Sequence, residues 1–99
     1  MLITIVAGAR PNFIKISPII KAIELATINF PNLSYRLVHT GQHFDTKMSH
    51  VFFSQLEIPT PHINLHSGGG TQAEQAATIM VQFERDLLEN KPDIVLVVG

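Results

Sequence analysis

Four short apolar segments alternate with three longer segments of helical pattern, and this alternation is the feature that most constrains the fold. The apolar segments are residues 2–7, 35–39, 62–65 and 94–98. Short apolar runs of this kind are typical of strands that are covered on both faces, so we expect 94–98 to be a buried strand. The order β-α-β-α-β-α-β predicts an α/β fold, a parallel sheet with right-handed crossovers and helices on both faces.

The first two helical segments begin with residues that are favourable at helix starts. Pro11 suits a first helical turn, and an apolar stripe follows it at steps of three and four residues. Pro18 leaves two alternatives, one helix with a bend or a second start that Ser17 caps. Asp45 is the expected cap of the second helix, which carries Met48, Phe52 and Leu56 on one face.

The third helical segment opens with a capping box. Thr71 is the expected N-cap and Glu74, three residues later, reaches back to it. One side of this helix is apolar, and its expected members are Ala76, Met80, Phe83 and Leu87. The carboxylates expected on its solvated face are Glu84, Asp86 and Glu89.

Composition excludes several classes of protein. Ninety-nine residues suit one small domain, and seven scattered Lys and Arg with a net charge of −1 argue against nucleic-acid binding. The absence of cysteine excludes a disulfide scaffold, a thiol nucleophile and a thiolate metal site. Because no apolar run is long enough to span a membrane and no basic segment precedes the first strand, we expect a cytoplasmic protein without a signal peptide.

In an open parallel sheet, ligands bind beyond the carboxyl ends of the strands. Arg10 and Lys15 fall at the start of the helix that follows the first strand, where the helix dipole and two cations suit a diphosphate. The alternative, that both are ordinary solvated charges, is about as well supported by spacing alone. No G-x-G-x-x-G or G-x-x-x-x-G-K-[ST] motif is present, which disfavours a dinucleotide or P-loop site.

Other candidate positions at this edge are weaker. The glycines at 68–70 precede a helix and suit an anion cradle, although a plain flexible loop is the more favoured interpretation. The five histidines lack the spacing of a metal site, and His43 alone is expected to face a ligand. No residue is a convincing general base, so no catalytic residue is expected within the chain.

Several motifs together resemble the non-hydrolysing UDP-N-acetylglucosamine 2-epimerases. Residues 8–18, GARPNFIKISP, resemble the G-T-R-P-E-x-I-K-x-x-P signature of that family, with Ala9, Asn12 and Phe13 as departures. Residues 40–43 resemble its T-G/A-Q-H segment, 73–75 its A-E-Q segment, and 91–97 its K-P-D-x-V-L-V segment. The matches run the length of the chain in the family's order.

The resemblance implies two Rossmann-like domains in the GT-B arrangement, with residues 1–99 as part of the amino-terminal one. It implies interconversion of UDP-N-acetylglucosamine and UDP-N-acetylmannosamine by elimination and re-addition of UDP, without metal or other cofactor. Arg10 and Lys15 match residues on the phosphate side of the substrate, whereas Gln42 and His43 match a cleft segment that some members use for an activating UDP-N-acetylglucosamine. A homodimer, and a place in bacterial cell-envelope polysaccharide synthesis, are also implied.

The leading hypothesis is therefore an amino-terminal fragment that has no activity of its own and binds UDP weakly. The alternatives are a fragment of a hydrolysing 2-epimerase or of a GT-B glycosyltransferase, and a non-catalytic α/β binding module. If the strand order is 3-2-1-4, the apolar last strand lies at an open edge, and the fragment is expected to self-associate.

Overall fold

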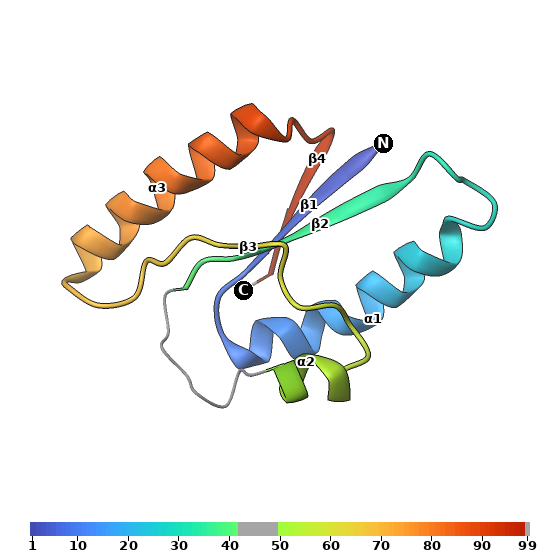
Figure 1. Ribbon diagram of the computed structural model, residues 1–99, viewed down its shortest axis with the longest axis horizontal. Coiled ribbons are helices and arrows are strands. Elements are labelled where there is room, and N and C mark those ends of the chain that lie inside the picture. Colours follow the sequence, from blue (N-terminus) through green and yellow to red (C-terminus); the bar gives the residue numbers. More distant parts are fainter. Residues whose placement is uncertain (42–49, 99) are drawn as a thin grey trace.

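A four-stranded parallel sheet forms the centre of the computed structural model, which describes residues 1–41 and 50–98. Its strands are β1 (Leu2–Ala7), β2 (Ser34–His39), β3 (Ile63–Asn64) and β4 (Ile94–Val97). They are arranged in the order β3-β2-β1-β4, and each adjacent pair is parallel (Figure 1). The predicted parallel α/β fold is confirmed, and the strand order is 3-2-1-4, the case for which an open edge at the last strand is expected.

Helices lie on both faces of the sheet. α1 (Arg10–Ala26) and α2 (His50–Gln55) lie on one side, and α3 (Gln72–Glu89) lies on the other (Figure 1). Pro18 lies inside α1 without dividing it, so the chain forms one helix there. Ser17 does not cap a second start: its buried hydroxyl donates to the Leu56 carbonyl at 3.0 Å. Asp45, the predicted cap of the second helix, lies outside the described residues.

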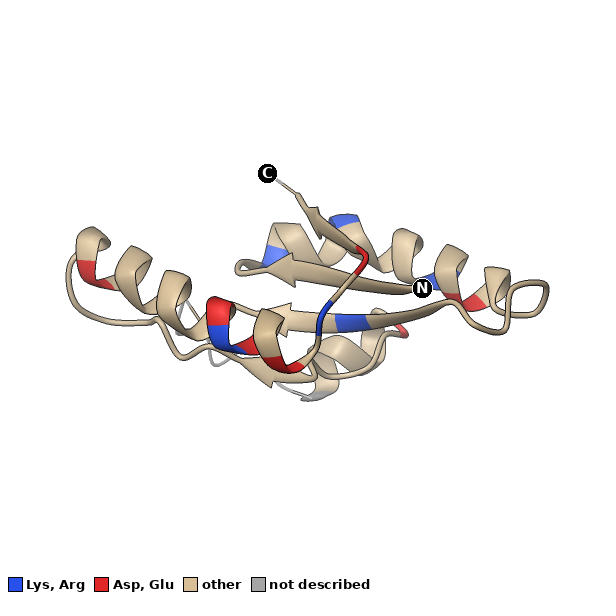
Figure 2. Cartoon of the chain, turned by 90° about the horizontal axis from the view of Figure 1, so that it is seen from above, with Lys and Arg blue, Asp and Glu red and all other residues tan. Residues whose placement is uncertain are grey.

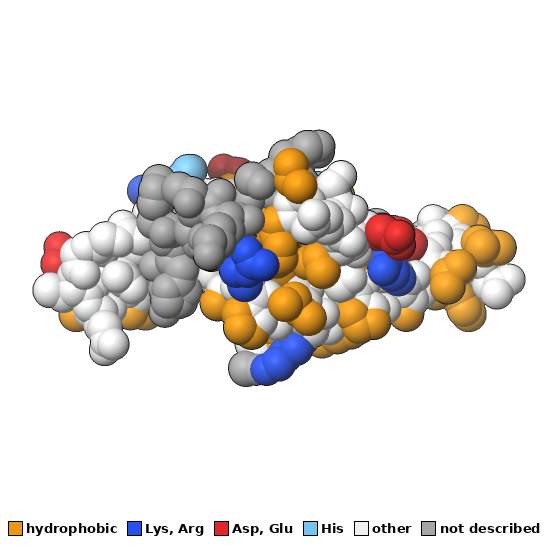
Figure 3. All heavy atoms as spheres, turned by 90° about the horizontal axis from the view of Figure 1, so that it is seen from below, with side chains coloured by type: hydrophobic (Ala, Val, Ile, Leu, Met, Phe, Trp, Pro, Cys, Tyr) orange, Lys and Arg blue, Asp and Glu red, His pale blue; other side chains and the backbone are white. Residues whose placement is uncertain are grey.

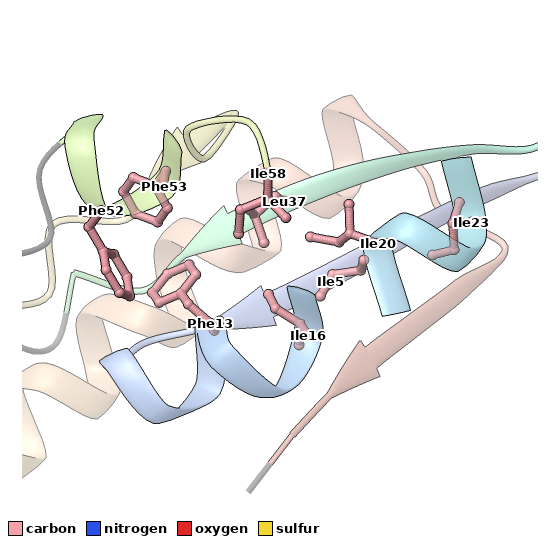
Figure 4. Packing of buried hydrophobic residues seen from close by; sticks show 10 residues of the cluster. Ile5, Phe13, Ile16, Ile20, Ile23, Leu37, Phe52, Phe53 and Ile58 are labelled. Atoms are coloured by element: carbon pink, nitrogen blue, oxygen red, sulfur yellow. The ribbon is translucent and has the colours of Figure 1, made fainter. Parts of the chain in front are cut away.

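The hydrophobic core fills the space between the sheet and the α1–α2 layer (Figure 4). Alternate residues of β1 and β2 point to this side, and the apolar stripe of α1 packs against them. The fully buried members are Ile5, Phe13, Ile16, Ile20 and Leu37. Each such side chain contributes roughly 1.5–3 kcal/mol, so this layer stabilises the sheet and fixes the start of α1.

The opposite face is held to α3 by an ion pair rather than by a broad apolar layer. Arg36 of β2 donates to Asp86 of α3 through Nε at 3.2 Å and Nη2 at 2.7 Å, and Asp86 is 2% exposed. The prediction that Asp86 belongs to a solvated face is therefore wrong. The predicted apolar side is partly exposed as well: Met80 is 72% exposed, and Phe83 and Leu87 are half-buried.

The last strand, β4, lies at the edge of the sheet. Its amino end is fixed by the backbone N–H of Leu2, which donates to the Asp93 carboxylate, and by the Asp93 N–H, which donates to the Leu2 carbonyl, both at 2.8 Å. Val97 is 68% exposed. The predicted burial of residues 94–98 is wrong for Ile94, Val95 and Val97, which are exposed, whereas Leu96 and Val98 pack partly buried against the core. In the part that the structure describes, β4 pairs with β1 alone, so its other edge is open.

Charged residues are scattered over the described elements (Figure 2). Basic and acidic residues are interspersed along the chain, and no continuous run of basic residues follows any described helix or strand. None of the described helices is both long enough and apolar enough to cross a bilayer.

Candidate functional site

The carboxyl ends of β1, β2 and β3 are tied together by short hydrogen bonds. The Thr40 N–H, directly after β2, donates to the carbonyl of Ala7 at the end of β1, at 3.0 Å. Ser67, after β3, donates to the Thr40 carbonyl twice, from its N–H at 3.1 Å and from its hydroxyl at 2.6 Å. Because Thr40 and Ser67 are both buried, the three loops form one fixed edge.

Gly41 lies at the centre of this edge and has a left-handed backbone, with φ of +73°. Its N–H donates to Nδ1 of the buried His39 at 3.1 Å. A Cβ atom at this position would overlap Asn64 Oδ1 and would lie 2.8 Å from the backbone nitrogen of His66. Glycine is therefore required by both conformation and space. The next two residues, Gln42 and His43, are candidates that lie outside the described residues.

Arg10 is the first residue of α1, at the carboxyl end of β1. Its guanidinium carbon Cζ lies over the ring of Phe52 in α2, 4.5 Å from the ring centroid. Lys15, five residues further along α1, is exposed. On the face that α1 and α2 form, Lys and Arg side chains lie beside exposed hydrophobic atoms (Figure 3). Both predicted cations thus belong to the helix that leaves the carboxyl edge of the sheet, which we call the ligand edge because open parallel sheets bind ligands there.

The backbone at the start of α1 is capped by the side chain of Asn12. Its Oδ1 accepts the N–H groups of Gly8 at 3.2 Å and of Ala9 at 3.0 Å. Pro11 has no N–H. The N–H groups of Gly8 and Ala9 are therefore occupied by the chain's own side chain, and the charged groups that α1 offers near this turn are Arg10 and Lys15.

The start of α3 carries the predicted capping box, which is confirmed. The Glu74 N–H donates to the Thr71 hydroxyl at 3.1 Å, and the Thr71 N–H donates to Glu74 Oε1 at 3.0 Å. Hydrogen bonds from Thr71 lower the pKa of the Glu74 carboxyl, which stays ionised at this helix N-terminus. Since the chain's own carboxylate occupies that position, the adjacent Gly68–Gly70 loop is less suited to bind an anion.

The described histidines with assigned contacts make structural hydrogen bonds. His62 Nδ1 accepts the backbone N–H of Leu37 at 2.8 Å. Burial, together with the positive charge of Arg36, lowers the pKa of His62, so its ring is neutral near pH 7. Within residues 1–41 and 50–98, no group of three His, Asp or Glu side chains has a geometry that would hold a metal ion.

Two contacts of the charged residues were not found from the sequence. Arg36 interrupts an otherwise largely apolar strand, which is a signal that an acidic partner is needed, but the sequence does not say which acid. The contact between Arg10 and Phe52 joins residues 42 positions apart, and the apolar pattern around Phe52 indicates only a core residue.

These features define a Rossmann-like α/β domain whose ligand edge carries two cations at its first helix. A family model described as UDP-N-acetylglucosamine 2-epimerase matches residues 26–99. The chain belongs to this family.

Among its relatives, the UDP-N-acetylglucosamine 2-epimerase of Methanocaldococcus jannaschii is 40% identical over all 99 residues, which correspond to 26% of that protein. The UDP-2,3-diacetamido-2,3-dideoxy-D-glucuronate 2-epimerase of Pseudomonas aeruginosa is 46% identical over 99 residues, 27% of its length. The chain thus spans about a quarter of the length of these curated relatives.

A solved structure shows the same fold. The crystal structure of the Methanocaldococcus jannaschii enzyme in complex with UDP-GlcNAc and UDP superposes with a TM-score of 0.87 at 40% identity. The match covers 100% of this chain and 26% of that one. The predicted parallel α/β architecture is therefore that of the matching part of a 2-epimerase.

Proposed function

We propose that residues 1–99 form part of the amino-terminal domain of a UDP-sugar 2-epimerase of the GT-B arrangement and supply its phosphate-side contacts. The observation that carries this proposal is the position of Arg10. It begins α1 at the ligand edge, in a fold that closely matches an enzyme solved with UDP-GlcNAc and UDP. Lys15 extends the same positive site along α1.

The proposed reaction interconverts UDP-N-acetylglucosamine and UDP-N-acetylmannosamine. The bond between the sugar and UDP breaks as the proton on C2 is removed, and UDP then adds back after a proton is returned to the other face of C2. Negative charge grows on the diphosphate as it leaves. Arg10 would stabilise that charge through a planar set of N–H donors, and Lys15 would act as a point charge.

Proton transfer at C2 requires groups that residues 1–41 and 50–98, the part described by the structure, do not provide at the ligand edge. Glu74 is engaged in the cap of α3, Asp86 is paired with Arg36, and Asp93 lies at the amino end of β4. Carboxylates already held by such hydrogen bonds are poor bases. We therefore propose that residues outside positions 1–99 move the proton, and that the 99 residues alone have no epimerase activity.

The sugar is proposed to be N-acetylglucosamine or a 2,3-diacetamido uronic acid. The first is named for the archaeal relative, which is 40% identical, and the second for the Pseudomonas relative, which is 46% identical. Both substrates share UDP and a 2-acetamido group. Contacts of Arg10 and Lys15 with the phosphates would serve either substrate, so these two residues do not choose between the sugars.

The proposal extends to a cytoplasmic homodimer that makes precursors of cell-envelope polysaccharides, without cofactor. The exposed side chains of Met80 and Leu88 on α3 support a further contact surface. Gln42 and His43 stay proposed cleft or activator contacts, on the strength of the T-G-Q-H segment. Relatives from archaea as well as Pseudomonas show that the source need not be bacterial.

A chimera tests the function directly. The matching quarter of the Methanocaldococcus jannaschii enzyme is replaced by this chain, and conversion of each UDP-sugar is followed by NMR. We expect activity with at least one of the two sugars. Arg10→Ala should lower it by about 10²-fold or more, and Lys15→Ala should lower it as well. The matched control is Lys21→Ala, which removes a cation of α1 whose partner is the exposed Glu57. An active chimera that tolerates both substitutions would contradict the proposed roles.

A further inference from the structure

We infer that Phe52 is a positioning residue that holds the Arg10 guanidinium in place for the substrate diphosphate, an inference that rests on the proposed function. The contact is a cation–π interaction, with Cζ 4.5 Å from the ring centroid. This lies well within the range of about 6 Å over which such contacts attract.

The ring of Phe52 is itself held from several sides. It is 7% exposed and meets the ring of Phe13 edge-on, with centroids 6.4 Å apart and planes at 88°. The ring of Phe53 lies 5.4 Å from it, and Phe13 in turn meets Phe53 at 5.1 Å (Figure 4). The ring of His39 also lies 5.1 Å from that of Phe13. Aromatic rings from α1 and α2, with His39 of β2, therefore fix the surface on which the guanidinium rests.

A ring is a suitable support for an arginine that must bind an anion. A carboxylate partner would neutralise the guanidinium and occupy its N–H donors, as Asp86 does for Arg36. An aromatic face attracts the positive charge but leaves the N–H groups, which lie at the rim of the guanidinium plane, open to phosphate oxygens. In the part of the chain that the structure describes, no carboxylate pairs with Arg10.

The contact between Phe52 and Arg10 also lowers the entropic cost of binding the diphosphate. An unrestrained arginine side chain samples many rotamers, and fixing it against the diphosphate is unfavourable. Stacking on a buried ring removes part of that freedom before the substrate arrives. Phe52 would thus act on affinity and on the leaving-group step through Arg10, without contacting the substrate.

Substitutions in the complete protein that carries these residues test the role. Phe52→Leu keeps an apolar side chain but removes the aromatic face, and we expect UDP affinity, measured by calorimetry, to fall about 3- to 30-fold. Ile20→Val is the matched control, because Ile20 is fully buried in the same core but takes no part in the aromatic contacts of Phe52 or in the contact with Arg10. It should lower thermal stability to a similar degree and leave UDP affinity unchanged.

Two further measurements separate positioning from packing. Replacing Phe52 by phenylalanines with one, two and three fluorines weakens the negative face with little change of shape, and UDP affinity should fall stepwise. This series remains informative if Phe52→Leu does not fold. In an Arg10→Ala background, Phe52→Leu should cause no additional loss.

The outcomes distinguish failure of the positioning role of Phe52 from failure of the proposed function. Equal losses of affinity in Phe52→Leu and Ile20→Val, or no response to fluorination, would overturn the positioning role while leaving the proposed function intact. If Arg10→Ala alone leaves UDP affinity unchanged, the phosphate-side assignment fails, and the positioning role fails with it.

Discussion

Gly41 is the position where one added methyl group should disturb the ligand edge most. Two costs apply to Gly41→Ala. An alanine at φ of +73° is strained by about 1–2 kcal/mol. Its Cβ would also lie 2.8 and 2.9 Å from the backbone N and Cα of His66. It would overlap Asn64 Oδ1 too, the atom that accepts the His66 N–H. Since backbone must move to relieve these contacts, a further cost of about 1–3 kcal/mol is expected.

The matched control is Gly69→Ala. Gly69 has a similar φ of +85°, but no atom lies within 4 Å of the added Cβ. This variant should therefore show the conformational cost alone. Thermal unfolding of the complete protein, followed by circular dichroism, should place Gly41→Ala several degrees below Gly69→Ala. Equal melting temperatures would refute the argument that close approach, and not only left-handed geometry, requires glycine at position 41.

Three other substitutions test the packing described above. Asp86→Ala leaves the mostly buried Arg36 without its partner and should lower the free energy of unfolding by about 2–4 kcal/mol in urea titrations, whereas Glu84→Ala, on the exposed side of α3, should change it by less than about 0.5 kcal/mol. Because the folded-state pKa of His62 lies below its unfolded value, stability should be complete above pH 6.5 and decline as the pH falls; His62→Asn keeps an acceptor for the Leu37 N–H and should flatten that decline. The 99-residue chain should self-associate through β4 in light scattering and should bind UDP weakly, and Val97→Lys should shift it towards monomer; a monomeric parent chain at high concentration would count against the open edge.

The order of elements could be predicted from the sequence because the patterns that encode it are local. Each apolar run and each capping signal acts within about one turn or one strand, as Thr71 and Glu74 show. Parallel pairing then follows from the alternation itself. The exposure of Val95 and Val97 in β4 is not predicted, because an apolar run indicates what a strand prefers to contact, not whether another element covers each face of it.

Contacts of charged residues with partners far away in the sequence could not be predicted from local sequence patterns. Asp86 was assigned to a solvated face from its neighbours on the helix, yet its partner Arg36 lies 50 residues away. The same limit applies to Arg10, for which spacing alone left a solvated charge and a phosphate contact about equally supported. Helical periodicity specifies a face, and only the packing of α2 and α3 against the sheet shows what that face meets.

Two of the described arginines, Arg36 of β2 and Arg10 of α1, have opposite kinds of partner, and the difference separates a structural role from a functional one. Arg36 is neutralised by a buried carboxylate that also accepts a hydrogen bond from Asn90, so its donors are consumed in fixing α3. Arg10 rests on an aromatic ring that supplies attraction without an acceptor. A cation that is held but not neutralised keeps its capacity to bind an anion. The partner of each arginine, more than its position in the sequence, therefore favours Arg10 as the residue that meets the diphosphate.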